Sequence, residues 1–332
     1  MSAALRFGVI GSGAWGTALA ILANRAGSDV CLWTRSESIK EMIEQRRTND
    51  VYLPDIFIEP SIEVTTDLRT ACAADALILA VPAQSLRSLC ISLSDLLQPE
   101  TPLIIACKGI ERGSLALMSE VVNATLPANP VMVLSGPNFA NEAAKGVPTA
   151  TVLAATERDE AERVRFALGG KYFRPYLSDD VIGVQIGGAI KNVIAIACGV
   201  ANGMGYGENA RAALVTRGLA EMIRLAEVRG GKRETLTGLS GFGDLMLSCC
   251  SRTSRNMALG YGIGSGKEGL EAVKAQSHGL TEGVATAESV YQMALKLGVS
   301  MPISMTVHEV LTGILTVEEG IKALLSRPFA SE

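Results

Sequence analysis

Over the first 180 residues, short apolar runs alternate with segments that have the periodicity of helices. The expected strands are residues 7–10, 29–33, 62–65, 76–81, 103–107, 131–134, 149–155 and 172–177. Helical patterns lie between several of these runs, at residues 17–23, 38–47 and 157–168. Strands that are apolar throughout are typical of parallel sheets covered on both faces. The alternation therefore predicts an α/β fold with a doubly wound sheet.

From residue 181 onward the strand-like runs disappear and helical patterns dominate. The expected helices include residues 187–195, 212–228, 281–297 and 317–325, and the glycine-rich segment 262–266 is expected to be a mobile loop. A chain of 332 residues is long enough for two domains. We therefore expect an α/β domain over residues 1–180 and an all-helical domain over residues 181–332.

The first expected strand ends in three glycines with the spacing G-x-G-x-x-G, and a helical pattern follows at once. Gly11 permits the tight turn, Gly13 lets the backbone approach a pyrophosphate, and Gly16 lets helix and strand pack closely. The free N–H groups and dipole of the helix can then hold the negative charge. Because strand and helix are both recognisable, a dinucleotide site is favoured over a plain turn. Its expected contacts are Gly11, Ser12, Gly13, Ala14, Trp15 and Gly16.

The second expected strand ends in Thr34 and Arg35. A site restricted to NAD usually has an acidic residue here, which binds the ribose 2′-hydroxyl. An arginine instead suits a 2′-phosphate, so we expect NADP to be accepted, alongside NAD. The alternative is that Arg35 is an ordinary solvated cation of a loop.

The composition limits which classes of binding partner and which cellular compartment are expected. The formal net charge is −4 and no cluster of Lys and Arg is longer than two residues, which argues against nucleic acid or an anionic membrane. Seven cysteines without CxxC spacing are expected to be reduced, buried thiols of a cytoplasmic protein. The two histidines lack ligand spacing, so no metal is expected. We also expect no signal peptide, because the first expected strand begins within a few residues of the N-terminus. No membrane span is expected, because Lys191 interrupts the longest apolar stretch.

Lys191 lies in a helical pattern built otherwise of Ile, Val, Ala and Gly, so it is expected to be buried. Burial disfavours the charged form of an amine, and such a lysine can exchange a proton near neutral pH. Gly187 and Gly188, one turn earlier, are expected to leave room for a ligand beside the ammonium. The alternative is a lysine that extends its charged end to solvent at a domain boundary.

Further polar residues follow the expected strands or begin helical segments. Lys108 ends a buried strand, where ligands of doubly wound sheets bind, although an ordinary strand-end lysine is the alternative. The pair Arg255 and Asn256 supplies a planar cationic fork and an amide, which suit a phosphate. Asp244 can orient a lysine or bind a substrate hydroxyl, and helix capping is its alternative role. Glu282 precedes a helical segment, so helix capping is an equally good explanation for it as ligand binding.

The conjunction of motifs closely resembles the bacterial NAD(P)-dependent sn-glycerol-3-phosphate dehydrogenases, from about Leu5 to Leu325. The motifs are Gly11-x-Gly13-x-Trp15-Gly16-Thr17-Ala18, Ala106-Cys107-Lys108-Gly109, Ser135-Gly136-Pro137-Asn138-Phe139-Ala140, Lys191-Asn192 and Ser254-Arg255-Asn256. The resemblance implies a Rossmann-type dinucleotide-binding domain, a helical substrate-binding and catalytic domain, and a cytoplasmic homodimer. It also implies reduction of dihydroxyacetone phosphate to sn-glycerol 3-phosphate with NAD(P)H, for phospholipid synthesis.

The family's site residues are carried over by motif, with Lys191 as the catalytic proton-transfer residue. The substrate contacts implied are Lys108, Gly136, Asn138, Lys191, Asp244, Ser254, Arg255 and Asn256. The further cofactor contacts implied are Arg35, Lys108, Ala140, Arg255, Leu280 and Glu282. Asn138 departs from the family, which more often has Ser or Thr there.

Two other functions compete with this one. β-Hydroxyacid dehydrogenases also combine a Rossmann domain, helices and a catalytic lysine, but they typically place an Asn four residues after the lysine. Here that position is Ala195, and Asn192 is adjacent to Lys191 instead. A regulator that senses NAD(P) without turnover would need a DNA-binding or partner-binding module, and no basic module is visible in the sequence.

Overall fold

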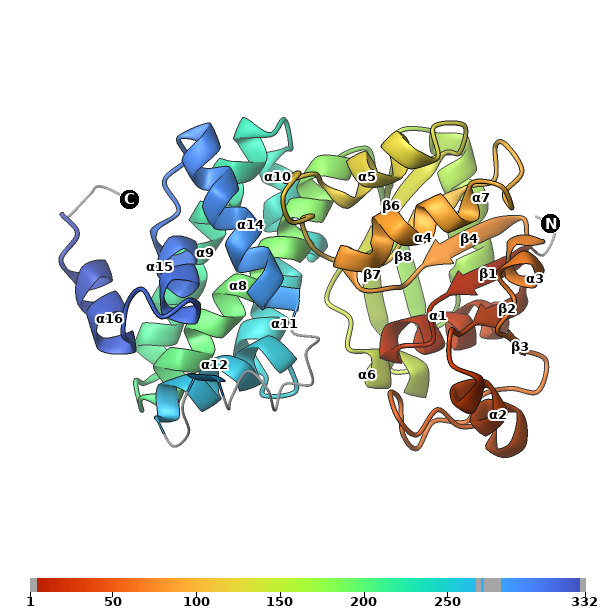
Figure 1. Ribbon diagram of the computed structural model, residues 1–332, viewed down its shortest axis with the longest axis horizontal. Helices are drawn as coiled ribbons and strands as arrows, with labels where there is room; N and C mark the ends of the chain where they lie inside the picture. The colour runs from red at the N-terminus through yellow and green to blue at the C-terminus, as the bar shows by residue number, and fades with distance from the viewer. Residues whose placement is uncertain (1–4, 267–269, 272–281, 329–332) are drawn as a thin grey trace. The chain divides into compact units, whose positions relative to one another are not determined.

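The computed structural model describes residues 5–266, 270–271 and 282–328. Contacts divide the chain into two units (Figure 1), the first made of Met1–Lys108 and Ala116–Val184, the second of Gly109–Leu115 and Gln185–Glu332. The short segment Gly109–Leu115 belongs to the second unit because it bonds to helix α14 (Glu282–Leu297). Ser289 Oγ donates to the Ile110 carbonyl at 3.2 Å, and Arg112 pairs with Glu288 at 2.9 Å.

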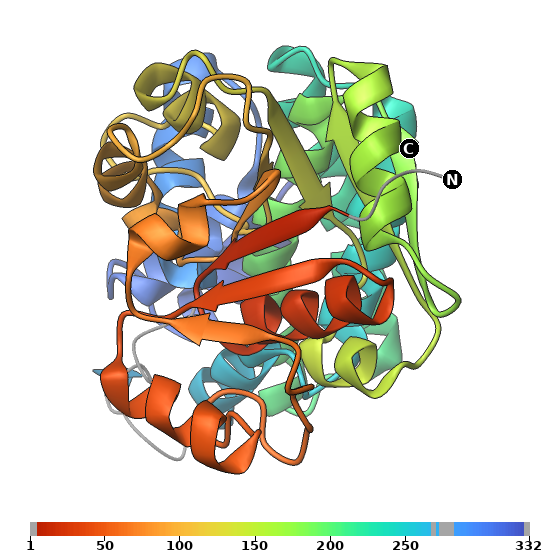
Figure 2. The same cartoon turned by 90° about the vertical axis from the view of Figure 1, so that its right-hand side faces the viewer.

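The first unit is built on an eight-stranded sheet with the order β3-β2-β1-β4-β5-β6-β7-β8 (Figure 2). The strands are β1 Arg6–Ile10, β2 Asp29–Trp33, β3 Glu63–Thr65, β4 Ala76–Leu79, β5 Leu103–Ile105, β6 Val131–Ser135, β7 Thr149–Ala155 and β8 Phe173–Ser178. The first six are parallel and have the 3-2-1-4-5-6 order of dinucleotide-binding folds. β7 runs antiparallel to β6, and β8 runs parallel to β7. The predicted doubly wound sheet is confirmed, with two strands reversed at one edge.

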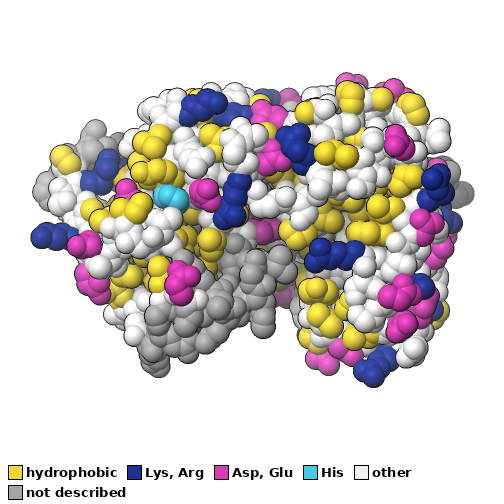
Figure 3. Space-filling view, viewed as in Figure 1, with side chains coloured by type: hydrophobic (Ala, Val, Ile, Leu, Met, Phe, Trp, Pro, Cys, Tyr) yellow, Lys and Arg dark blue, Asp and Glu magenta, His cyan; other side chains and the backbone are white. Residues whose placement is uncertain are grey.

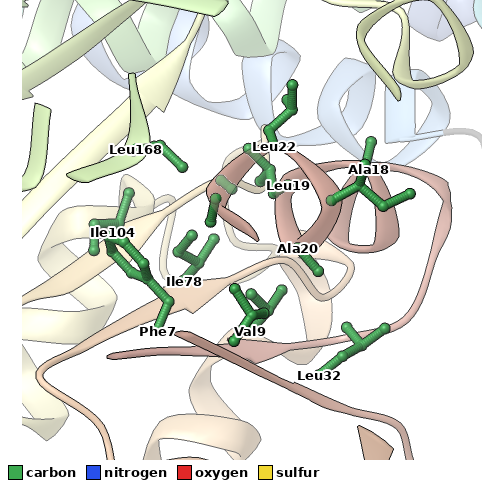
Figure 4. Close-up of a cluster of buried hydrophobic side chains, with 14 of the residues drawn as sticks. Phe7, Val9, Ala18, Leu19, Ala20, Leu22, Leu32, Ile78, Ile104 and Leu168 are labelled. Carbon is green, nitrogen blue, oxygen red and sulfur yellow. The ribbon is translucent and has the colours of Figure 1, made fainter. Parts of the chain in front are cut away.

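A large hydrophobic core of this unit lies between the sheet and helix α1 (Ala14–Arg25), as Figure 4 shows. Val9 of β1 lies between Leu32 of β2 and Ile78 of β4, and all three are fully buried. Eight consecutive residues of α1, from Gly16 to Ala23, are buried. A helix that is apolar on every side needs cover on every side, which the sheet and neighbouring helices supply.

The other helices of the first unit connect successive strands. They are α2 Glu37–Arg46, α3 Leu68–Cys72, the 3₁₀ turn η1 Ala83–Ser85, α4 Leu86–Leu93, α5 Met118–Thr125, α6 Ala140–Lys145 and α7 Arg158–Leu168. α1 begins just after β1 and α6 begins after β6, so both helix N-termini lie beyond the carboxyl ends of strands. This is the edge of a doubly wound sheet at which ligands bind.

Apart from Gly109–Leu115 and the connecting turns, the described part of the second unit is helical. Its elements are α8 Val181–Gly203, which begins in the first unit, α9 Glu208–Val228, α10 Arg233–Thr237, the π-helical turn η2 Leu239–Gly243, α11 Asp244–Cys250, α12 Arg255–Ser265, α14, α15 Pro302–Leu311 and α16 Val317–Leu325. Within the described residues, α8 alone is long and apolar enough to cross a membrane by length and composition, but 83% of its apolar window is buried. The core helix of a globular protein has the same properties.

The expectation of a loop at residues 262–266 is wrong, because α12 continues to Ser265. The glycines here serve helix packing. A Cβ on Gly260 would lie 2.1 Å from the Ile196 carbonyl oxygen, and one on Gly264 would lie 2.1 Å from the Val200 carbonyl oxygen. Gly199 and Gly203 of α8 meet α12 in the same way. Two small-xxx-small pairs therefore let the backbones of α8 and α12 come into contact.

Glu221 of α9 is 1% exposed and binds the N-terminus of α15. Its carboxylate accepts hydrogen bonds from Ile303 N at 2.6 Å, Ser304 N at 3.0 Å and Ser304 Oγ at 2.8 Å. These donors occupy first-turn positions, whose N–H groups have no partner within the helix. Burial raises the pKa of Glu221 above its ordinary value of 4.5, and the three donors oppose that rise.

Candidate functional site

The Gly11–Gly16 turn joins β1 to α1, and each glycine meets a different physical requirement. Gly11 has φ +118°, and a Cβ there would lie 2.6 Å from the Ala80 carbonyl oxygen of the neighbouring connection. A Cβ on Gly16 would lie 1.8 Å from the Gly11 carbonyl oxygen, so only glycine lets the helix approach the turn. Around Gly13, by contrast, a Cβ would have no neighbour within 4 Å. The turn is therefore closed on the protein side and open at Gly13.

The N-terminus of α1 fits the phosphates of a dinucleotide. Gly13 is the N-cap, no side chain caps the helix, and its first turn holds no acidic residue. Its orphan N–H groups and dipole favour an anion there. Ala14 and Trp15, both half-buried, are the first two residues of this helix. Arg35, an exposed cation, follows the end of β2. These residues could hold a nicotinamide dinucleotide.

The ends of β5 and β6 meet through Lys108. Its Nζ donates to the Gly136 carbonyl at 3.1 Å. Asn138, two residues further, donates from Nδ2 to the Ala150 carbonyl at 3.0 Å, while its buried Oδ1 has no partner among the described residues. The amide nitrogen is thus hydrogen-bonded to β7, and the amide oxygen can accept a hydrogen bond from another donor. Ala140 is the first residue of α6.

Lys191 lies in the middle of α8 and bonds to two side chains of α11. Its Nζ lies 3.0 Å from Asp244 Oδ1 and donates to Ser248 Oγ at 2.7 Å. The Lys191 side chain is 12% exposed and that of Asp244 is 1% exposed. Asp244 and Ser248 are four residues apart, so both face α8 from one side of α11. The arrangement holds one ammonium in a fixed position with its charge balanced.

The π-helical turn η2 brings α11 to this position. The expectation that Gly187 leaves room for a ligand is wrong, because the turn fills that space. A Cβ on Gly187 would lie 2.5 Å from the Ser240 carbonyl oxygen and 3.2 Å from Gly241 Cα. The missing side chain lets η2 approach α8, and Asp244 is the next residue after the turn.

Asn192, next to Lys191, begins a chain of amides that links three helices. Asn256 Nδ2 donates to Asn192 Oδ1 at 2.9 Å, and the Gly283 N–H donates to Asn256 Oδ1 at 3.1 Å. Asn192 Nδ2 is buried and has no partner among the described residues. Asn256 therefore connects α8, α12 and α14, and Asn192 retains a free donor.

Three further predicted residues lie at the starts of α12 and α14, the helices that Asn256 connects. Ser254 caps α12, accepting from Met257 N at 3.4 Å, so its hydroxyl has a structural partner. Arg255 is exposed, and no ion-pair partner is found for it among the described residues. Glu282 begins α14. The predicted contact Leu280 lies outside the described residues.

Ser248 and Asn192 were not predicted as site residues from the sequence. Ser248 could have been found from its i, i+4 spacing to Asp244 on a helical segment. Asn192 could have been found as a polar side chain directly after Lys191 in a mostly apolar helix. On the face shown in Figure 3, the described Lys and Arg side chains are interspersed with Asp and Glu. Among the described residues, no group of three or more His, Cys, Asp or Glu side chains could hold a metal ion.

Comparison with known proteins covers both units. Models of the NAD-dependent glycerol-3-phosphate dehydrogenase N-terminus and C-terminus match residues 6–161 and 180–322. Glycerol-3-phosphate dehydrogenase [NAD(P)+] of Maricaulis maris is 45% identical over 100% of this chain and 99% of its own length. The enzyme of that name from Rhodospirillum rubrum is 47% identical, over 98% and 93%.

A solved structure is similar to this chain over nearly its whole length. The crystal structure of glycerol-3-phosphate dehydrogenase from Coxiella burnetii superposes with a TM-score of 0.92 at 36% identity, covering 98% of this chain and 99% of that chain. Sequence, fold and the order of the two units point the same way. The chain belongs to the NAD-dependent glycerol-3-phosphate dehydrogenase family.

Proposed function

We propose that the protein reduces dihydroxyacetone phosphate to sn-glycerol 3-phosphate with NAD(P)H, and that Lys191 supplies the proton. Membership of the family supports the reaction, and the relatives carry the name glycerol-3-phosphate dehydrogenase [NAD(P)+]. The observation that carries the assignment of Lys191 is that this lysine of a mostly apolar helix contacts Asp244 and Ser248.

NAD(P)H held at the Gly11–Gly16 turn would supply the hydride that reduces the carbonyl carbon of the substrate. The ketone oxygen gains negative charge as the hydride arrives, and the Lys191 ammonium stabilises this charge and donates a proton to that oxygen. Asp244 and Ser248 hold Nζ in one place, which reduces the loss of entropy on reaching the reactive geometry. The product is a secondary alcohol, and Lys191 recovers its proton from solvent.

Substrate recognition needs donors for a phosphate and for hydroxyl oxygens. We assign the phosphate to Arg255, because its guanidinium is exposed and can bind two oxygens at once. The unpaired Nδ2 of Asn192 suits a substrate oxygen next to Lys191. Lys108, Gly136 and Asn138 are proposed as further contacts. Ser254 and Asn256 support the site through their bonds to α12 and α14.

For the cofactor, we propose that the Gly11–Gly16 turn binds the pyrophosphate and that Arg35 binds the 2′-phosphate of NADP. Further cofactor contacts are proposed at Lys108, Ala140, Arg255, Leu280 and Glu282. We also propose a cytoplasmic homodimer that supplies glycerol phosphate for phospholipid synthesis.

Oxidation of NADH and NADPH at 340 nm with dihydroxyacetone phosphate tests the reaction. Lys191→Ala should lower kcat by more than about a hundredfold, because proton transfer and oxyanion stabilisation are both lost. Lys296→Ala, which changes an exposed lysine at the end of α14, is the control and should leave kcat unchanged. Activity of Lys191→Ala within about tenfold of wild type would remove Lys191 from the chemistry.

A further inference from the structure

Asn49 lies behind the Gly11–Gly16 turn, in the connection that follows α2. Its side chain is fully buried, and Nδ2 donates to the Ser12 carbonyl at 2.8 Å and to Thr17 Oγ1 at 2.9 Å. The Thr17 hydroxyl in turn donates to the same carbonyl at 3.2 Å. Because a carbonyl only accepts, this contact determines which amide atom of Asn49 faces the turn. The Ser12 carbonyl is thus held by two donors.

Holding this carbonyl orients the next peptide N–H. In a trans peptide the C=O and the following N–H point to opposite sides, and the chain contains no cis peptide among its described residues. With the Ser12 carbonyl directed at Asn49 and Thr17, the Gly13 N–H points away from them. It donates to no backbone carbonyl of the described residues, and space is open around Gly13.

The same network extends to the loop that carries Arg35. Ser12 Oγ donates to Thr34 Oγ1 at 2.8 Å, and Thr34 Oγ1 also accepts from Ser36 N at 3.3 Å. Ser12 and Thr34 are 7% and 2% exposed, so water competes little for these bonds. The residues on either side of Arg35 are therefore connected to the turn, and through it to Asn49.

We propose that Asn49 is a positioning residue for the dinucleotide: it fixes the Ser12–Gly13 peptide so that the Gly13 N–H faces the cofactor pyrophosphate. Asn49 itself does not touch the cofactor. The inference rests on the dinucleotide site of the proposed function. Without Asn49, one of the two donors to the Ser12 carbonyl is lost and the peptide can rotate. The hydrogen bond between a Gly13 N–H and a charged phosphate oxygen would then be weakened.

Asn129 provides a matched control in the same unit. It is 8% exposed, and its Nδ2 also donates two hydrogen bonds, to the Gln98 carbonyl at 2.9 Å and the Thr101 carbonyl at 3.0 Å. It precedes β6, so it lies at the amino ends of the strands, opposite the edge that carries the glycine turn. Asn49→Leu and Asn129→Leu therefore each remove two hydrogen bonds donated by a buried amide, at opposite ends of one sheet.

The experiment is a titration of the full chain with ADP-ribose and with NADH, followed by tryptophan fluorescence. The chain has two tryptophans, Trp15 in the turn and Trp33 at the end of β2, so quenching reports on this site. Asn49→Leu should raise Kd for both ligands by about 10- to 50-fold, as expected for a lost hydrogen bond to a charged group. Asn129→Leu should change Kd by less than about twofold, even where its urea midpoint falls equally.

Equal Kd changes in the two variants would overturn the proposal, because a merely structural role would affect both alike. If Asn49→Leu does not fold, Thr17→Val decides, since it removes the hydroxyl that bonds to both Asn49 and the Ser12 carbonyl at constant volume. A Kd that rises several-fold supports the proposal, and an unchanged Kd overturns it. A wild-type chain that binds neither ligand would instead refute the dinucleotide site itself.

Discussion

Replacing Asp244 by asparagine removes the negative charge next to Lys191 while keeping the volume and one oxygen of the side chain. Nζ and Oδ1 are 3.0 Å apart, and the two side chains are 12% and 1% exposed, so water screens the pair weakly. At an effective dielectric constant of about 20, unit charges at this distance attract by about 5 kcal/mol. Removing one partner of a buried pair typically lowers the free energy of unfolding by about 3–5 kcal/mol. Because asparagine still offers an acceptor, we expect a loss of about 2–4 kcal/mol.

Urea denaturation can assign this loss to the correct unit. Far-UV circular dichroism reports on the helices of both units, and more of the helical residues lie in the second unit, whereas both tryptophans lie in the first unit. The Asp244→Asn variant should shift the dichroism midpoint more than the fluorescence midpoint. Lys191→Met and the double variant complete a cycle, and removing both charges should destabilise less than the sum of the single changes. We expect a coupling energy of at least about 1.5 kcal/mol.

The same variants distinguish the positioning of Lys191 Nζ from its role in proton transfer. Asp244→Asn should lower kcat by about a hundredfold, because a displaced ammonium no longer meets the substrate oxygen. Ser248→Ala removes one hydrogen bond of 2.7 Å from the ammonium to an uncharged hydroxyl and leaves Asp244 in place, so kcat should fall by about tenfold. The reasoning fails if the double variant is additive within about 0.5 kcal/mol, or if Asp244→Asn retains the wild-type kcat.

Three further predictions concern substitutions in the glycine turn, at Arg35 and at Glu221. Gly11→Ala should lower the free energy of unfolding in urea by about 1–3 kcal/mol, because the φ of Gly11 is +118°. Gly13→Ala should leave this free energy almost unchanged and raise the Kd of NADH in a ligand titration. Arg35→Gln should raise KM for NADPH about tenfold and leave KM for NADH unchanged; equal effects on both would argue against a 2′-phosphate contact. Glu221→Gln should destabilise by about 1–3 kcal/mol, since an amide cannot accept all the hydrogen bonds that the carboxylate accepts. Because the folded-state pKa of Glu221 is raised, the unfolded chain releases this proton first. The wild type should therefore lose part of its advantage over Glu221→Gln as pH rises above 4.5, which urea denaturation at several pH values would show.

The strands of the first unit could be predicted well because a strand covered on both faces must be apolar throughout. The runs at residues 29–33 and 149–155 coincide with β2 and β7. The direction of a strand leaves no such signal. β7 is buried over its last five residues, like the parallel strands, and nothing in its sequence marks its antiparallel pairing with β6.

Glycines caused the errors in the second unit because their roles depend on a partner helix. Gly262, Gly264 and Gly266 in a short segment suggest a loop when considered alone. In the structure Gly264 lies against the backbone of Val200, a residue more than sixty positions earlier, and α12 continues through the segment. A local preference for turns was outweighed by close packing of two helices.

The groups that would face a ligand and the groups that position them differ in how visible they are in a sequence. Gly13 and Lys191 stand out because glycine spacing and a charge within an apolar helix are local anomalies. Asn49 and Ser248 do not stand out, since a polar residue in a connection or on a helix is ordinary. Asn49 reaches Ser12 across 37 positions and Ser248 reaches Lys191 across 57, so only the fold brings each pair together. Variants of these two residues therefore test the structure itself: if they behave like surface substitutions, the contacts that the fold creates do not support the chemistry that the motifs predict.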